Sequence, residues 1–182
     1  TQDELIKFRE DGGKVFQLFK RFHGHPLPIL QMKVHPFFIK WLTILAVLNM
    51  LKKNQKPIFV FVPTIAIGQR LHRWLSIFFE DVTIAYSTIN ERETIVEKFK
   101  KKSSGILVTT SILERGITMI GLQVIIFMAD HELFLTSTLI QMAGRVGRKK
   151  LDPHGKVILF ANKVTAVMKA AQEKITIANA HL

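Results

Sequence analysis

The chain has 182 residues, of which 48% are hydrophobic and 22% are charged, a composition that excludes an intrinsically disordered chain. The length is enough for one domain whose core needs no disulfide or metal to hold it together. Lysine and arginine total 26 against 14 acidic residues, and the resulting net charge of +12 indicates a polyanionic partner such as nucleic acid, with a solubilising surface as the alternative.

Membrane insertion and secretion are both disfavoured by the sequence. The most apolar stretch, residues 37–51, contains Lys40 and is shorter than the roughly 20 residues that a spanning helix needs, so we expect a buried core helix there. The polar N-terminal stretch TQDELIKFRED does not have the pattern of a signal peptide. The absence of cysteine excludes disulfides and thiolate metal sites and agrees with a cytoplasmic protein.

The first 35 residues differ from the rest of the chain. An acidic helical stretch is followed by an extended segment and by the turn HGHPLP, whose two prolines oppose helix. His23 and His25 have a spacing that can chelate a metal, but two histidines without further ligands are more often part of a linker. We therefore expect residues 1–35 to connect to an upstream lobe and residues 36–182 to form the domain.

Helical and strand patterns alternate from residue 35 onwards. In chain order, the sequence predicts a helix at 35–53, a strand at 58–62, a helix at 65–79, a strand at 82–86, a helix at 90–102, strands at 105–108 and 124–128, a helix at 136–146, a strand at 156–160 and a helix at 163–179. Most of these strands are apolar on both faces, which is typical of parallel strands that are covered on both sides. The predicted fold is α/β, a parallel sheet with helices on both faces and functional groups at the carboxyl ends of its strands.

The strongest functional signal is the segment QMAGRVGR, from Gln141 to Arg148. On a helix that begins near Thr136, Gln141, Arg145 and Arg148 share one face, and arginine suits the bidentate recognition of phosphate oxygens. Gly144 and Gly147 each cost a helix roughly 1 kcal/mol relative to alanine, which indicates that a backbone or a ligand comes close. The alternative is a solvated basic helix end. The expected apolar stripe consists of Leu139, Met142, Ala143 and Val146.

Hydroxyl side chains follow the third predicted strand. Thr109 and Thr110 come at its carboxyl end, where hydroxyls and the N-terminus of a following helix can bind phosphate oxygens. Ser111 and Glu114 have the spacing of a capping box, which gives Glu114 a structural role as an alternative to a functional one. Gly116 either ends the short helix in a left-handed conformation or leaves room for a nucleotide.

Thr64 follows the first predicted strand and Pro63, and it precedes a helix. This position is that of an N-cap, and capping alone is the simpler explanation, although free N–H groups at a helix start can also hold a nucleic-acid phosphate. Lysines at 98, 100, 101 and 102 would add counterion release if they faced the same strand, but such a run is more often a solvated helix end.

The sequence lacks a phosphate-binding loop of the form G-x-x-x-x-G-K-[ST], since Gly12-Gly13-Lys14 has neither the upstream glycine nor the hydroxyl residue. The segment Asp130-His131-Glu132 superficially resembles a DExH box, but we interpret it as a loop after a strand. ATP hydrolysis needs a phosphate cradle, magnesium and a positioned water, and the sequence offers only the group that stabilises charge. We therefore expect the 182-residue chain alone to be inactive as an ATPase.

Three of these segments resemble motifs of superfamily 2 helicases and occur in the order of that family's second RecA-like lobe. Residues 141–148 are similar to motif VI, residues 108–118 (VTTSILERGIT) to motif V, and residues 58–64 (IFVFVPT) to motif IV, which is followed by the strand end at Tyr86 and Ser87. The resemblance spans about residues 56–162. Within the superfamily, the combination of HGHPLP, ERGIT and QMAGRVGR is most similar to the DNA-uptake ATPases of the ComFA type, and next to PriA-type replication-restart helicases.

Two departures separate the chain from DEAD-box RNA helicases. Those relatives have His-Arg where this chain has Gln141-Met142, and aspartate where it has Thr118. The departures point away from DEAD-box RNA helicases and leave the contact to the ribose open.

The resemblance implies a helicase C-terminal RecA-like lobe at residues 36–182 that closes on an upstream lobe of the same protein across ATP and magnesium, which the upstream lobe mainly holds. It implies that Arg145 and Arg148 stabilise the transferred phosphate and that Gln141 couples the nucleotide to the strand. The implied nucleotide-binding residues are Gly116, Thr118, Gly144, Arg145 and Arg148, and those contacting single-stranded DNA are Thr64, Ser87, Thr109 and Thr110.

A ComFA-like protein would also work with membrane-bound DNA-uptake machinery, at the inner face of the membrane. The alternatives are a PriA-like restart helicase lobe and, from a different class, a basic nucleic-acid-binding module without a link to ATP.

Overall fold

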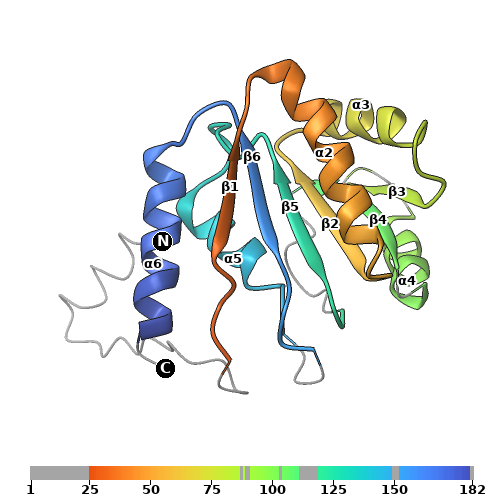
Figure 1. The fold of residues 1–182 in the computed structure, drawn as a ribbon. Helices are drawn as coiled ribbons and strands as arrows, with labels where there is room; N and C mark the ends of the chain where they lie inside the picture. Colours follow the sequence, from red (N-terminus) through yellow and green to blue (C-terminus); the bar gives the residue numbers. More distant parts are fainter. Residues whose placement is uncertain are drawn as a thin grey trace.

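The computed structural model describes residues 25–86, 88, 91–102, 104–110, 119–148 and 152–180. Within these residues, six parallel strands form one sheet in the order β1-β6-β5-β2-β4-β3 (Figure 1). The strands are β1 (Leu30–Val34), β2 (Pro57–Val62), β3 (Val82–Ala85), β4 (Gly105–Thr110), β5 (Gln123–Phe127) and β6 (Val157–Ala161). The helices are α2 (Phe37–Lys52), α3 (Ile65–Leu75), α4 (Arg92–Lys101), α5 (Thr136–Ala143) and α6 (Ala166–Ala180).

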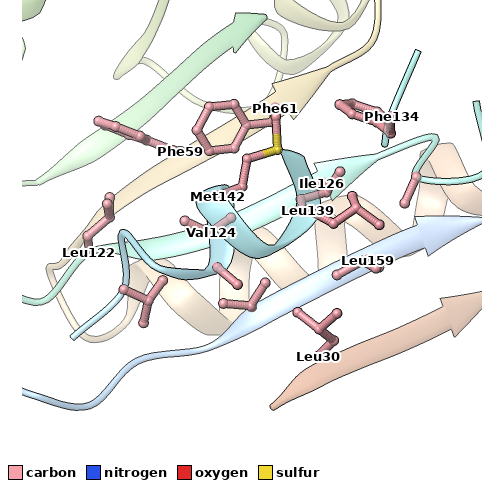
Figure 2. Packing of buried hydrophobic residues seen from close by; sticks show 14 of the residues in the cluster. Leu30, Phe59, Phe61, Leu122, Val124, Ile126, Phe134, Leu139, Met142 and Leu159 are labelled. Atoms are coloured by element: carbon pink, nitrogen blue, oxygen red, sulfur yellow. The ribbon is translucent and has the colours of Figure 1, made fainter. Parts of the chain in front are cut away.

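Helices cover both faces of the sheet. Alternate residues of the central strand β2 point to opposite sides, so that Phe59 and Phe61 pack with α4, α5 and α6 while Ile58 and Val60 pack with α2 and α3. Figure 2 shows the first of these cores, in which Met142 of α5 points toward Phe61. Burial of the central strands on both sides explains their uninterrupted apolar sequences, and the predicted parallel α/β sheet is confirmed.

β1 is the element that the sequence reading did not include. It lies within the segment expected to be a connector, yet it pairs in parallel with β6, with Leu30 opposite Val157 and Val34 opposite Ala161. The strand is at the edge of the sheet, and only Leu30 among its five residues is buried, so its sequence LQMKV carries little apolar signal. The sheet therefore begins before residue 36.

α2 occupies the apolar stretch that raised the membrane question. In the part of the chain that the structure describes, no helix is long and apolar enough to span a bilayer. The buried stripe of α2 begins with Lys40, which is fully buried, and continues through Ile44, Leu48 and Leu51. Burial lowers the pKa of Lys40 from its ordinary value of 10.5, and the nearby Asp130 carboxylate offsets part of this lowering.

Replacing Lys40 with methionine should change how stability depends on pH. Between the lowered pKa of the folded state and the ordinary value of 10.5, the unfolded chain binds more protons than the folded chain, so the stability that Lys40 contributes rises with pH in this window. Lys40→Met removes this rise. Urea unfolding at neutral pH and at a pH just below 10.5 measures it, with Lys33→Met on the exposed side of β1 as the control. An equal rise in Lys40→Met and the wild-type chain would contradict the assignment.

Candidate nucleotide and nucleic-acid interface

Thr64 starts helix α3 at the carboxyl end of β2. Its backbone is extended, and its Oγ1 accepts a hydrogen bond from the backbone N–H of Ile67 at 3.2 Å, so the predicted N-cap is confirmed. One turn later, a Cβ on Gly68 would lie 3.0 Å from a methyl carbon of Val62, which shows how closely α3 approaches β2. Thr64, Gly68 and the end of β2 thus form a tight corner at the carboxyl edge.

Thr109 and Thr110 end the neighbouring strand β4, and their side chains point to opposite faces of the sheet. Thr109 is buried, and its hydroxyl donates a hydrogen bond to the Thr110 carbonyl at 3.2 Å. Thr110 lies on the α3 side, like Val108, and its buried Oγ1 makes no hydrogen bond with any residue that the structure describes. Thr110 therefore keeps a free hydroxyl beside the corner of α3, whereas the hydroxyl of Thr109 is already engaged.

The segment with the two arginines is not a continuous helix. α5 ends at Ala143, and residues 144–147 form a turn in which Gly147 has a φ of 65°. The expected single face formed by Gln141, Arg145 and Arg148 is therefore wrong: Gln141 and Arg148 are exposed, while Arg145 is buried with a relative exposure of 9%. The cause is the backbone of the turn: the N–H groups of Arg145 and Val146 bond to carbonyls three residues back instead of four, and the left-handed Gly147 then redirects the chain before Arg148.

The expected apolar stripe is confirmed, since Leu139, Met142, Ala143 and Val146 are all buried. The positive φ explains why residue 147 is glycine. Gly144 has a φ of −62°, which any residue adopts, so its own backbone conformation does not require glycine.

The arginine turn lies at the amino edge of the sheet. A Cβ on Gly155, just before β6, would lie 2.5 Å from a methyl carbon of Val146 and 2.8 Å from the carbonyl oxygen of Leu122, just before β5. The turn is therefore packed against the amino ends of β5 and β6. The prediction that functional groups gather at the carboxyl edge holds for Thr64, Thr109 and Thr110, and it does not hold for the arginines.

A shallow pocket of about 570 Å³ lies at the same amino edge. Its lining residues are Asn54, Lys56, Gln123, His154, Gly155 and Lys156. The amide of Gln123 is engaged on both sides, donating to the Gly121 carbonyl and accepting from the Lys156 N–H, each at 2.8 Å, and Lys56 forms an ion pair with Asp152. The sequence offered no signal for this pocket, because its residues come from three separate segments.

The Asp130-His131-Glu132 segment is a loop after β5, as the sequence reading has it. One carboxylate oxygen of Asp130 accepts hydrogen bonds from the backbone N–H and the side-chain amide of Asn162, both at 3.0 Å, and thereby ties the end of β5 to the end of β6. No group of three or more His, Cys, Asp or Glu side chains able to hold a metal ion occurs among the described residues.

Several predicted site residues lie outside the described residues. They are Ser87, Ser111, Glu114, Gly116 and Thr118. Their roles stay predictions.

Residues 40–150 match the family described as the helicase conserved C-terminal domain, which is more than half of the chain. The chain belongs to this family. Its fold is that of the RecA-like lobe of these helicases: the structure of S. cerevisiae Dbp5 bound to RNA and ADP BeF3 superposes with a TM-score of 0.69 at 17% identity, covering 99% of this chain and 47% of that one.

The chain is also similar to two curated bacterial proteins. Competence protein ComFA of Streptococcus pneumoniae is 32% identical over 175 residues, which are 91% of this chain and 40% of the relative. UvrABC system protein B of Xylella fastidiosa is 29% identical over 170 residues, which are 91% of this chain and 25% of the relative. The chain therefore spans less than half the length of these relatives.

A methyl group on Gly155 should displace the arginine turn. Because the added Cβ meets Val146 and a backbone carbonyl closer than 3.0 Å, Gly155→Ala should lower the free energy of unfolding by about 1–3 kcal/mol. Gly144→Ala is the matched control: its Cβ meets only carbonyl oxygens of its own helix, at 3.3 Å, and should change stability by less than about 1 kcal/mol. Urea unfolding of both variants measures this, and equal losses would contradict the close packing of the turn.

Proposed function

We propose that this helicase C-terminal lobe closes on an upstream RecA-like lobe across ATP and moves a single strand of DNA along its carboxyl edge. The observation that carries the proposal is the separation of two sets of groups on one sheet: hydroxyl groups at the carboxyl edge and an arginine turn at the amino edge. Because a rigid sheet lies between the two sites, a movement of the lobe as one body shifts both of them together. Binding at one site can therefore be coupled to binding at the other.

The arginine turn suits the nucleotide side of such a motor. Arg148 is exposed and can present its planar guanidinium to phosphate oxygens across a lobe interface, while the buried Arg145 is held within the lobe. Gln141 is exposed on the last turn of α5, directly before the arginines, where it can link the nucleotide to the motion of this helix. Magnesium bound with ATP would supply charge neutralisation of the phosphates, and its ligands would come from the upstream lobe.

The carboxyl edge suits the backbone of a nucleic-acid strand. The N-terminus of α3 offers N–H groups beside Thr64, and Thr110 adds an unengaged hydroxyl on the same side of the sheet. The net charge of +12 supplies the attraction to phosphates that does not depend on sequence. Contacts of this kind hold a strand without reading its bases.

For the whole protein we propose DNA translocation during transformation, supported by the 32% identity to ComFA of Streptococcus pneumoniae. In that role it would act in the cytoplasm with membrane-bound uptake machinery. A PriA-like restart helicase is the second candidate, and neighbouring genes separate the two. A basic binding module without ATP chemistry is the third, and the full reading frame tests it, since a phosphate-binding loop and a D-E-x-D/H box upstream would exclude this module.

Removing the exposed arginine should slow ATP hydrolysis without unfolding the lobe. An arginine that stabilises the transition state contributes about 10³-fold or more, roughly 4 kcal/mol of barrier, so we expect such a loss in kcat for Arg148→Ala in the full-length protein, with little change in DNA affinity. Arg148→Lys should rescue poorly, because lysine lacks the planar fork. Steady-state ATPase kinetics measure this, with the 182-residue chain alone expected to show no turnover.

Arg145→Ala serves as the comparison in the same assay. Because Arg145 is buried, we expect this variant to lower the melting temperature as well as kcat, whereas Arg148→Ala should leave the melting temperature unchanged. Near-normal turnover in Arg148→Ala would contradict a catalytic role and would indicate that Arg148 is only part of a solvated basic helix end.

Binding of a single-stranded oligonucleotide should weaken steeply with salt. Each phosphate contact contributes about −0.7 to the slope of log affinity against log salt concentration, so Arg70→Gln on exposed α3 should reduce the slope by about that amount. Lys169→Gln on α6, on the other face of the sheet, removes the same charge and should leave the slope unchanged. Titration of a labelled oligonucleotide at several salt concentrations measures both, and a salt-independent affinity would rule out the phosphate track.

A further inference from the structure

Tyr86 stands at the carboxyl end of β3, the strand at the edge of the sheet next to β4. It is the single tyrosine of the sequence. The side-chain amide of Gln69, on the first turns of α3, donates a hydrogen bond to the Tyr86 hydroxyl at 2.9 Å. This contact joins two partly or fully exposed side chains from different elements, so it orients the ring at the surface rather than inside the core.

The ring lies on the same side of the sheet as the free hydroxyl of Thr110. In the pairing of β3 with β4, Ala85 is opposite Thr109, which places Tyr86 beside Thr110 one residue further along. Tyr86 comes two residues after Ile84, and Thr110 comes two residues after Val108. Because Ile84 and Val108 pack on the α3 side, Tyr86 and Thr110 face that side as well. The corner of α3 therefore brings together a helix start, a hydroxyl and an oriented aromatic ring.

The charged residues of α3 are basic. Neither α3 nor β3 contains an acidic residue, and Arg70 and Arg73 are exposed on α3 next to Gln69. A purely structural role for Tyr86 requires only that its ring cover the end of the sheet, which phenylalanine would do as well. The hydrogen bond to Gln69 adds a fixed orientation, and a fixed aromatic ring beside phosphate-binding groups is suited to stacking on a base.

We propose that Tyr86, oriented by Gln69, stacks on a nucleobase of the strand whose phosphates meet Thr64 and Thr110. This inference rests on the proposed binding of a strand at the carboxyl edge. Stacking is tolerant of base identity, so it adds affinity without sequence preference and, unlike the phosphate contacts, without dependence on salt. The site would bind a strand through two independent interactions, the electrostatic contacts to phosphates and the stacking on a base.

The test compares an ordinary single-stranded oligonucleotide with an abasic one of equal length and charge. Stacking contributes about 1–3 kcal/mol per base, which corresponds to an affinity ratio of roughly 5- to 150-fold. Tyr86→Ala should weaken binding of the ordinary oligonucleotide by a factor in this range, leave binding of the abasic one unchanged, and keep the salt slope. Gln69→Ala should show a smaller loss and Tyr86→Phe the smallest, because the ring remains.

Phe78→Ala is the matched control, since it removes an exposed aromatic ring beyond the opposite end of α3 and should change neither affinity. Thermal melting confirms that each variant is folded. An equal loss on both oligonucleotides, or no loss on either, would overturn the stacking assignment while leaving the strand track intact. If the wild-type chain bound neither oligonucleotide, the proposed function would fail, and the inference with it.

Discussion

All strands of the described sheet run in one direction, and this constraint decides where each candidate residue lies. The carboxyl ends of β2, β3 and β4 meet at one edge, so Thr64, Tyr86 and Thr110 become neighbours although they are far apart in the sequence. The helix between β5 and β6 must return toward the amino ends, and α5 therefore delivers the arginine turn to the opposite edge. The positions of both candidate sites follow from a single topological rule.

Three glycines in and near the arginine turn are glycine for different reasons. Gly147 has a left-handed backbone, and Gly155 has no room for a methyl group between Val146 and the Leu122 carbonyl. Both are explained inside the lobe. Gly144 has an ordinary helical backbone, and a Cβ there would lie 3.3 Å from the carbonyl oxygens of Ile140 and Gln141, which is a tight contact.

The helices and five of the six strands could be predicted from periodicity, because burial on one face or on both leaves a pattern in the sequence. β1 could not, since an edge strand with one buried residue leaves almost none. The end of α5 was missed because helical spacing was extended across two glycines. The core helix around Lys40 was expected, but the apolar pattern gave no sign that the lysine itself would be buried. The pairing of Gln69 with Tyr86 depends on how α3 crosses β3, which no local pattern encodes.

One carboxylate at the carboxyl edge has a role in the fold. Asp130 resembles part of a magnesium-binding box in sequence, yet its oxygen accepts two hydrogen bonds from Asn162, and its charge acts on the buried Lys40. A carboxylate engaged in this way serves the fold. Under the proposed function this lobe contributes positive charge alone, so hydrolysis would require the arginine turn to arrive at phosphates held elsewhere. The arginine turn would reach those phosphates only when the two lobes close, and closure would also move the strand-binding corner of α3. Placing the arginines on one lobe and the phosphate-binding groups on the other would therefore couple ATP hydrolysis to movement along DNA.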